Sequence, residues 1–387
     1  MAHMGVPGVE DVARLAVWLR SNGLPDAVPD VRLIAGGRSN LTYRLDFPSA
    51  GQAPVGSQTA GSQAAGSQAA GSASDSALRL VLRRPPLGHV LPTAHDMTRE
   101  YRVTSALHGT NVPVPRPVAL CQDPSVIGAP FYLMEWVDGA VLRTREDADS
   151  LTPAQAEEVS RRFVGMLATI HGLDVDDVGL GGFGRPEGYL ARQLTRWQRQ
   201  WELSATREMP GYEELLGRLA GGMPVHSEMG ESGPAGQARS AGSLVHGDFR
   251  LDNMLITLSG EPKIAAVVDW EMSTLGDPLA DLGLTLVYWA DPGEEDLLQF
   301  SRRGGLTTSP GFLTRAELAQ RYADMTGRDL TRLGYYMAFG CFKLAVVLEG
   351  IHARFLQHKT VGEGFDRQGE VVPALIERAH QLLNADM

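Results

Sequence analysis

Cysteine and lysine are both scarce in this chain of 387 residues. The two cysteines, Cys121 and Cys341, lie far apart in apolar segments, so we expect buried, reduced thiols and no disulfide. Of the 35 basic residues only three are lysines, namely Lys263, Lys343 and Lys359. Wherever the chain before Lys263 needs a side-chain cation at neutral pH, arginine must therefore supply it.

Positive charge is also in deficit. The chain has 46 acidic residues against 35 basic ones, a formal net charge of −11. This charge balance lacks the excess of basic residues that is typical of nucleic-acid-binding proteins. An acidic balance suits a cationic substrate but is also ordinary for a soluble protein. The first residues lack the basic and apolar regions of a signal peptide, and we expect no apolar run of the about 20 residues that cross a bilayer. These features predict a cytoplasmic protein with no membrane partner, and they leave the oligomeric state open.

Large apolar side chains are almost missing from residues 48–77. The pattern Gly-Ser-Gln-X-Ala occurs at 56–60 and recurs at 61–65 and 66–70. Such a segment cannot bury enough surface to offset the entropy of ordering it. Lengthening a loop from about 4 to about 30 residues costs only about 2 kcal/mol in closure entropy, so a fold can carry it. We expect a disordered insertion between two strands here, and a second flexible loop at about 221–243.

A dense polar motif stands between short apolar runs in the second half of the chain. Residues 246–253 read HGDFRLDN, and the apolar run 264–268 ends at a further acid, Asp269. The turn-forming sequence Ser-Gly-Glu-Pro precedes that run, which predicts a hairpin that brings Asp269 back beside Asn253. Carboxylate and amide oxygens are the ligands that magnesium prefers, so Asn253 and Asp269 are the predicted metal ligands.

This motif predicts phosphoryl transfer. Asp248 is placed to orient an attacking hydroxyl and to accept its proton, and Arg250 is a candidate cation for the charge on the moving phosphoryl group. The alternative is a set of structural loop acids, because Asp and Asn are common in turns. The complete pattern, H-G-D-x-x-x-x-N followed by an apolar hairpin and Asp, is too specific to favour that alternative.

Several motifs together resemble the aminoglycoside phosphotransferase and choline kinase-like family. They are residues 36–43 (GGRSNLTY), 81–86 (VLRRPP), 99–101 (REY), 112–115 (VPVP), 246–253, 267–271 (VVDWE) and 276–283 (GDPLADLG). The similarity runs from about Leu33 to Ala290 and is greater to the branch related to kinase-like domains fused to acyl-CoA dehydrogenases. It implies an α+β, bilobal, protein-kinase-like fold.

The resemblance implies a division of the chain at the linker after residue 136. Residues 1–136 would form a small antiparallel β lobe with one helix, which covers the nucleotide. Residues 137–387 would form a larger, mainly helical lobe that holds the catalytic loop, the magnesium site and the acceptor pocket.

The resemblance also places nucleotide contacts in the small lobe. Gly36 and Gly37 would form a hairpin tip whose N–H groups cover the ATP phosphates, followed by Ser39 and Asn40. Two glycines in a hairpin are equally expected as plain turn residues, and the family pattern decides between the two interpretations.

Arg83 stands where protein kinases have the lysine that contacts the nucleotide phosphates, on a strand predicted at 78–84. Arginine can bind phosphate with two parallel hydrogen bonds, so the exchange is chemically reasonable, and Arg84 is the other candidate. Glu100, on a helix predicted at 95–107, would be the ion-pair partner of Arg83. Otherwise Glu100 and its charged neighbours form a solvated helix face.

The adenine base would be bound at the linker between the lobes. By the same resemblance Met134 would border the adenine pocket, and the Glu135 carbonyl and the Val137 amide would bind the base. Only backbone groups are needed for these contacts, so the residue types carry little information.

The resemblance implies a small-molecule kinase that uses ATP and Mg²⁺. It would transfer the γ-phosphoryl group to a hydroxyl of a hydroxylated metabolite, such as a hydroxyacyl-CoA, or of an aminoglycoside-like sugar. The alternative is a nucleotide-binding pseudokinase that acts as a regulatory or scaffold module, a reading that the missing small-lobe lysine supports. A protein kinase is disfavoured, because Trp270 and Glu271 replace the usual Phe-Gly after Asp269. The preference for ATP or GTP stays open.

Other polar residues are expected to have structural roles. Asp277 and Asp281 are predicted to hydrogen-bond the catalytic loop and to cap the helix that follows. His171, at the end of a helix predicted at 153–171, is expected to be packed rather than catalytic. Trp197 and Trp201, four residues apart, are expected to pack in a helical core.

Overall fold

The computed structural model describes residues 6–34, 40–48, 78–87, 96–224, 242–294, 305–357 and 367–385. The chain divides into two compact units, Met1–Ser105 with Pro115–Trp136, and Ala106–Val114 with Val137–Met387. Residues 106–114 belong to the second unit, whereas the expected small lobe included them. Gly36, Gly37 and Ser39 lie outside the described residues, as do most of the expected insertion and most of the loop at 221–243.

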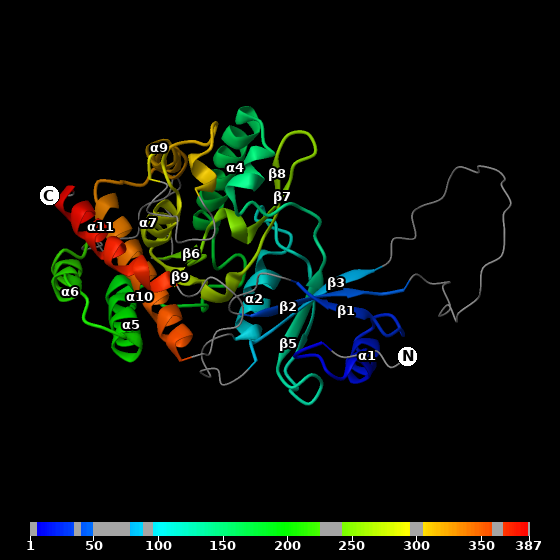
Figure 1. Ribbon diagram of the computed structural model, residues 1–387. Coiled ribbons are helices and arrows are strands. Elements are labelled where there is room, and N and C mark those ends of the chain that lie inside the picture. The colour runs from blue at the N-terminus through cyan, green and yellow to red at the C-terminus, as the bar shows by residue number, and fades with distance from the viewer. Residues whose placement is uncertain are drawn as a thin grey trace. The chain divides into compact units, whose positions relative to one another are not determined.

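The first unit is built on an antiparallel sheet of five strands in the order β1-β2-β3-β5-β4 (Figure 1). The strands are β1 (Asp30–Leu33), β2 (Leu41–Asp46), β3 (Arg79–Arg84), β4 (Pro117–Cys121) and β5 (Phe131–Glu135), and the helices are α1 (Val12–Ser21) and α2 (Met97–Leu107). The unit therefore carries α1 in addition to the single helix that the resemblance implied for the small lobe. The predicted strand and helix around Arg83 and Glu100 are both present.

Alternation along the central strand β3 assigns its side chains to two faces of the sheet. Leu80 and Leu82 belong to a core cluster with the apolar residues of α1, whereas Val81 packs with Met97 of α2. Because Arg83 lies two residues after Val81, it shares the face of the sheet that α2 covers.

The second unit consists mainly of helices. They are α3 (Arg145–Asp149), α4 (Pro153–His171), α5 (Tyr189–Ser204), α6 (Tyr212–Gly221), α7 (Pro278–Tyr288), α9 (Arg315–Thr326), α10 (Leu333–Leu356) and α11 (Val372–Ala385). Short 3-10 turns are η1 (Leu251–Asn253), η2 (Trp270–Met272), η3 (Leu306–Thr308) and η4 (Gln368–Glu370). Helix α4 begins where the sequence predicts, because Thr152 and Gln155 form a capping box around Pro153. Helices α5, α6, α10 and α11 share one large apolar core, which includes Trp197 and Trp201 as expected.

Two small antiparallel sheets hold the polar motif. Strands β7 (Met254–Thr257) and β8 (Lys263–Val267) form the predicted hairpin. Strand β6 (Ser243–Val245) pairs with β9 (Thr274–Gly276), a pairing that the sequence pattern did not indicate. Residues 246–253 therefore run from one small sheet to the other.

Helices α7 and α10 approach each other closely at two glycines. A Cβ on Gly283 would lie 2.5 Å from the backbone of Tyr336, and one on Gly340 would lie 3.0 Å from the Cα of Leu284. Larger side chains would separate the helices, so these glycines set their spacing. Helix α10 is thereby held against α7, which follows the polar motif in the chain.

Helix α10 corrects one expectation. Its 24 residues are long and apolar enough, by length and composition, to cross a membrane, although we expected no such run. Its most apolar stretch is 67% buried inside the second unit, as in the core helix of a packed domain, so the feature is weak evidence for a membrane span.

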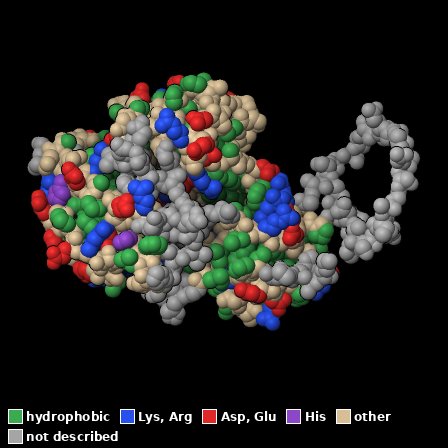
Figure 2. All heavy atoms as spheres, viewed as in Figure 1, with side chains coloured by type: hydrophobic (Ala, Val, Ile, Leu, Met, Phe, Trp, Pro, Cys, Tyr) green, Lys and Arg blue, Asp and Glu red, His purple; other side chains and the backbone are tan. Residues whose placement is uncertain are grey.

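Cys121 and Cys341 are buried free thiols, as predicted. On the face shown in Figure 2, acidic and basic side chains are interspersed with apolar ones.

Candidate active site

The polar motif forms a tight loop that depends on a glycine. Gly247 has φ +82°, and a Cβ there would lie 2.7 Å from the carbonyl oxygen of Met272. A side chain is therefore excluded by backbone conformation and by space. The loop then enters η1, and Thr285 of α7 donates a hydrogen bond to the carbonyl of Phe249 at 3.1 Å.

Asp248 lies at the centre of a cluster of polar side chains. Its Oδ2 is 3.2 Å from Nε of Arg250 and accepts a hydrogen bond from Nδ2 of Asn253, also at 3.2 Å. Burial raises the pKa of Asp248, and the positive charges of Arg250 and Lys343 oppose that shift. The carboxylate still has 22% of its side-chain surface exposed, so a small molecule can reach it.

Arg250 is held between two carboxylates. Its Nε is 3.0 Å from Oδ1 of Asp252 in addition to its contact with Asp248, and its guanidinium carbon lies 5.3 Å from the ring centre of Tyr288. Burial by itself would lower the pKa of Arg250, but the charges of Asp248, Asp252 and other nearby groups together outweigh it and raise that pKa. Arg250 is therefore a permanent cation beside the predicted base.

The hairpin returns Asp269 to the neighbourhood of Asn253, as the sequence predicts. The N–H of Val268 donates to the carbonyl of Asn253 at 2.9 Å, and the charge of Asp269 is close enough to act on both Asp248 and Arg250. Asp269 has φ +69°, the left-handed conformation that non-glycine residues seldom adopt and that concentrates at functional sites.

Asn253 and Asp269 have the chemistry of a magnesium site. The amide nitrogen of Asn253 is occupied by hydrogen bonds to Asp248, at 2.8 Å to its carbonyl and 3.2 Å to its carboxylate. The amide oxygen is thus the atom suited to a hard cation, together with the carboxylate of Asp269. No cluster of three or more His, Cys, Asp or Glu residues with metal-binding geometry occurs among the described residues. A magnesium site of one amide and one carboxylate does not need such a cluster, because water and phosphate oxygens complete it.

Asp281 holds the start of the loop from α7. It accepts hydrogen bonds from the N–H groups of His246 and Gly247, at 2.7 and 2.9 Å, and from Nε2 of His171 at 3.3 Å. Burial acts to raise the pKa of Asp281, but its hydrogen bond with His171 and the nearby imidazoles hold it below its usual value. His171 is buried and also contacts the Tyr322 hydroxyl at 2.7 Å, so it is a packed residue as expected.

Asp277 has the capping role that the sequence predicts. Its side chain accepts a hydrogen bond from the N–H of Leu279 at 3.0 Å, at the N-terminus of α7, and another from the hydroxyl of Tyr336 at 2.8 Å. It therefore ties α7 to α10 and supports the loop indirectly.

Lys343 is a residue of this site that the sequence reasoning did not assign. Its Nζ donates a hydrogen bond to the carbonyl oxygen of Gly247 at 2.6 Å, and lies 5.5 Å from the ring centre of Trp197. The sequence feature that could have indicated Lys343 is that lysine is rare in this chain. Lys343 is one of three lysines, and it lies in a strongly apolar helix. Its contact spans 96 residues of sequence, which no local pattern reveals.

In the first unit, Arg83 and Glu100 form the expected ion pair. Nε of Arg83 is 3.0 Å from Oε2 of Glu100, with 9% and 1% of their side chains exposed. Arg84 instead donates hydrogen bonds to the carbonyls of Gly8 and Ile127. Arg83 is therefore the arginine that is paired as the kinase lysine would be, and its contact with a nucleotide stays a prediction.

The remaining predicted nucleotide contacts have ordinary structural surroundings. Asn40 and Met134 are buried in the first unit, and Met134 pairs with Val81 across the sheet. The N–H of Glu135 donates to the carbonyl of Arg116 at 2.9 Å, and a contact of the Glu135 carbonyl with the base stays a prediction. Val137 is the first residue of the second unit after the break at Trp136.

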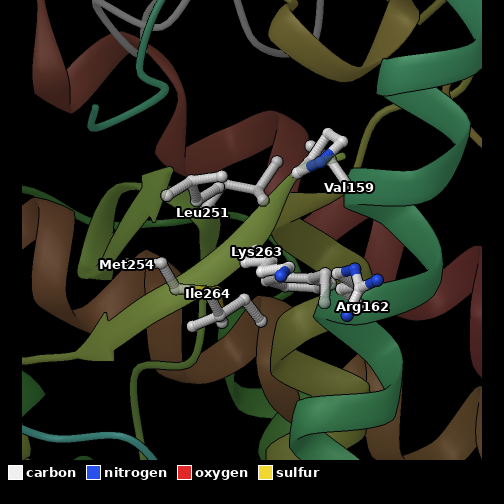
Figure 3. Close-up of a pocket in the computed structure, with 9 residues that line it drawn as sticks. Val159, Arg162, Leu251, Met254, Lys263 and Ile264 are labelled. Atoms are coloured by element: carbon white, nitrogen blue, oxygen red, sulfur yellow. The ribbon is translucent and has the colours of Figure 1, made fainter. Parts of the chain in front are cut away.

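A recess lies between α4 and strands β7 and β8. Figure 3 shows Val159 and Arg162 extending from α4 toward the strand residues Met254 and Ile264, with Leu251 of η1 at one end. Its lining side chains leave no room for a water-sized molecule, so it is not a pocket for a drug-sized ligand. We regard it as the packing seam that supports the hairpin.

An Asp-x-x-x-x-Asn loop with a following hairpin and acid, in an α+β chain of two units, defines a phosphotransferase with a kinase-like fold. The chain belongs to the phosphotransferase enzyme family, whose model matches residues 30–319.

Curated relatives include acyl-CoA dehydrogenase family members. Member 10 of Mus musculus is 34% identical over 302 residues, covering 78% of this chain and 27% of that protein. Member 11 of Homo sapiens is 32% identical over 304 residues, covering 78% of this chain and 37% of that protein. The chain thus spans about a third of the length of these relatives. The viomycin phosphotransferase of Streptomyces vinaceus is 28% identical over 177 residues, covering 46% of this chain and 55% of that protein.

Solved structures have the same fold. A Ralstonia eutropha protein, provisionally described as an aminoglycoside phosphotransferase, superposes with a TM-score of 0.71 at 30% identity, covering 97% of this chain and 98% of that one. An aminoglycoside phosphotransferase solved with ADP and hygromycin B has a TM-score of 0.55 at 13% identity, covering 95% of this chain and 97% of that one. A Plasmodium vivax ethanolamine kinase has a TM-score of 0.55 at 10% identity, covering 93% and 83%. The last two share the fold alone.

Proposed function

We propose that this chain transfers the γ-phosphoryl group of ATP to a hydroxyl group of a small molecule, with magnesium as the metal. The observation that carries the proposal is the cluster around Asp248. A partly exposed carboxylate is held by Arg250 and Asn253, with the charge of Asp269 close by.

Each residue of the cluster has a role in this reaction. Asp248 orients the acceptor hydroxyl and accepts its proton as the new O–P bond forms and the bond to ADP breaks. Arg250 steadies the charge on the transferred group, and the carboxylates of Asp248 and Asp252, each within 3.2 Å of its Nε, hold the guanidinium beside the base. Asn253 and Asp269 would hold magnesium, which neutralises phosphate charge when it is bound.

The first unit would supply the nucleotide contacts. Arg83, oriented by Glu100, would bind phosphate oxygens. The other proposed contacts, given by family position, are Gly36, Gly37, Ser39, Asn40, Met134, Glu135 and Val137. The nucleotides in the solved relatives, ADP among them, support a nucleotide donor here.

A nucleotide-binding pseudokinase is the weaker alternative. The absence of a small-lobe lysine favours it, but the Arg83–Glu100 pair provides a replacement for that lysine. The grouping of Asp248, Asn253 and Asp269 favours an active enzyme, because a protein that only binds nucleotide has no use for a base.

The acceptor is a hydroxylated small molecule, and two chemical classes are proposed. The acyl-CoA dehydrogenase relatives suggest a hydroxyacyl-CoA by association, and the solved aminoglycoside phosphotransferases suggest an aminoglycoside-like sugar. Incubation with γ-labelled ATP, magnesium and a panel of both classes, followed by mass spectrometry, tests the proposal. We expect a product heavier by one phosphoryl group, with ADP formed in equal amount. ATP-dependent thermal stabilisation without ADP formation or transfer to any acceptor would support the pseudokinase instead.

A further inference from the structure

Lys343 makes an unusual contact for a residue of an apolar helix. Its Nζ donates to the carbonyl oxygen of Gly247 at 2.6 Å, beside the ring of Trp197. Gly247 precedes the proposed base Asp248, so the contact reaches the peptide unit that carries that base. The close packing of α7 on α10, at Gly283 and Gly340, brings this part of α10 to the loop.

The same peptide unit is held at two points, and the peptide unit before it at a third. Its carbonyl, from Gly247, accepts the hydrogen bond of Lys343, and its N–H, from Asp248, points to Nδ1 of His246 at 3.3 Å. The preceding N–H, of Gly247 itself, donates to Asp281 at 2.9 Å. Gly247 has the conformational freedom of a glycine, so without such bonds the peptide before Asp248 could rotate.

A half-buried ammonium group at this position calls for a partner. Burial lowers the pKa of Lys343, and the carboxylates of Asp248 and Asp281 oppose that shift. Taking a charge out of water costs free energy unless a partner compensates it, so packing alone would favour methionine here. The charge is better explained by its partner, the loop.

We propose that Lys343 is a positioning residue for phosphoryl transfer: it fixes the Gly247–Asp248 peptide and so directs the Asp248 carboxylate toward the acceptor. The inference rests on the proposed function, because it assigns a role in that reaction. A misplacement of about 1 Å in a reacting group can cost on the order of 100-fold in rate, which sets the scale of the effect.

The kinetic test compares Lys343→Met, which removes the charge and keeps the length, with Lys343→Arg, which keeps the charge. Lys263→Met is the matched control, since Lys263 is an exposed lysine on β8 of the same unit. The probe is MgATP, with phosphate release to water and transfer to any acceptor found in the panel. For Lys343→Met we expect kcat to fall about 10- to 100-fold with KM for ATP within about threefold and thermal stability not lowered. Lys343→Arg should keep more activity than Lys343→Met, and Lys263→Met should match the unchanged protein.

Three outcomes would overturn the inference. They are an unchanged kcat in Lys343→Met, a rise in KM for ATP with kcat retained, and a loss of activity that follows a lowered unfolding temperature. The last would show a merely structural lysine.

A second measurement does not depend on turnover. With lysine-selective isotope labelling, the NMR spectrum contains only three lysine side-chain signals, because the chain has three lysines. The signal that disappears in Lys343→Met is that of Lys343. We expect the Lys343 ammonium protons to exchange with water more slowly than those of Lys263, and the Lys343 signal to move in Asp248→Asn. If this coupling is seen but no phosphoryl transfer occurs, the proposed function fails while the contact stands. If transfer occurs and Lys343 exchanges as fast as Lys263, the inference fails alone.

Discussion

The two units each bury a charged cluster, and the two clusters are built differently. In the first unit Arg83 and Glu100 form a pair with 9% and 1% of their side chains exposed. In the second unit Asp248 and Arg250 keep 22% and 21% exposure, and Asp248 shares Arg250 with Asp252. The first cluster is closed to solvent, and the second is accessible to a reactant.

This difference distinguishes an ion pair with a structural role from a carboxylate that can take part in a reaction. A closed pair keeps both partners charged and oriented, and it strongly resists the loss of either one. An accessible carboxylate whose pKa is raised by burial is less well stabilised as an anion, which is what a proton acceptor requires. Removing one carboxylate charge from each cluster should therefore have opposite effects on stability.

The largest expected effect is that of Asp248→Asn on turnover. Loss of the base should lower kcat by about 10²- to 10⁴-fold, while the affinity for nucleotide stays close to normal. Phosphate release and isothermal titration with a nonhydrolysable ATP analogue measure the two quantities. Asp324→Asn, an exposed change on α9, is the control. Undiminished turnover would show that Asp248 is not the base.

The same variant should not lose stability. A carboxyl group whose pKa is raised in the folded state contributes stability below its unfolded pKa, and loses it as the pH rises through the folded pKa. Ionised Asp248 therefore costs stability at neutral pH, and asparagine should leave the free energy of unfolding unchanged or higher. A clearly lower free energy of unfolding for Asp248→Asn, measured by urea denaturation, would contradict the proposed difference between the two clusters.

Glu100→Gln should give the opposite result. It removes the negative charge from a buried ion pair, which should cost about 3 kcal/mol of unfolding free energy. Asp26→Asn provides a matched control in the same unit, because the Arg20–Asp26 pair has 55% and 75% of its side chains exposed. That control should cost less than about 1 kcal/mol. Equal effects of both variants in denaturant titrations would argue that burial of the pair is unimportant.

Gly247→Ala should affect stability and turnover together. The added Cβ would meet the backbone of Met272 at 2.7 Å and would hold alanine at φ +82°, which should cost about 2 kcal/mol. Because the peptide it distorts carries Asp248, kcat should fall as well. Gly260→Ala is a useful comparison: its φ is also +82° but no atom lies within 4 Å, so it should show the backbone cost without the loss of kcat.

The smallest effect concerns Glu294, a partly exposed carboxylate in the second unit that two arginines bind. Its carboxylate binds Arg315 at 2.6 Å and Arg378 at 2.8 Å. Burial acts to raise the pKa of Glu294, but the hydrogen bonds from Arg315 and its other donors lower it to about 2. A lowered pKa means that ionised Glu294 stabilises the folded state. This stabilisation is present above the unfolded pKa near 4.5 and is lost as the pH falls toward 2.

Glu294→Gln should therefore cost about 1–2 kcal/mol at pH 7, and the difference from the unchanged protein should shrink as the pH falls below 4.5. Denaturation across that pH range measures it. A difference that is independent of pH would show that the charge contributes nothing. A charge effect here would show that a partly exposed carboxylate also stabilises the fold when two arginines bind it.

Much of the fold follows from local patterns in the sequence. The strand at 78–84, the helix at 153–171 and the hairpin that ends at Asp269 were predicted from periodicity and turn composition, and each is present. The capping role of Asp277 was predicted as well, and its side chain caps α7. Such features depend on residues close together in the chain, so a pattern of neighbours is sufficient to reveal them.

The closeness of Asp248, Asn253 and Asp269 was also predictable, because a short loop and a tight hairpin separate them. The choice between Arg83 and Arg84 was not. It follows from the alternation of β3 and from the position of Glu100, 17 residues further along the chain. The pairing of β6 with β9 was missed, since three-residue strands carry almost no periodic signal.

The sequence alone determined the chemistry available at the loop: an aspartate, an arginine, an asparagine and a second aspartate at spacings that suit phosphoryl transfer. Only the tertiary structure decided what holds that loop in place. Lys343 reaches Gly247 across 96 residues, and His171 reaches Tyr322 across 151. Such contacts depend on how helices pack. The role of the glycines where α7 and α10 meet, which is to allow close approach, can be recognised only when the two helices are placed side by side.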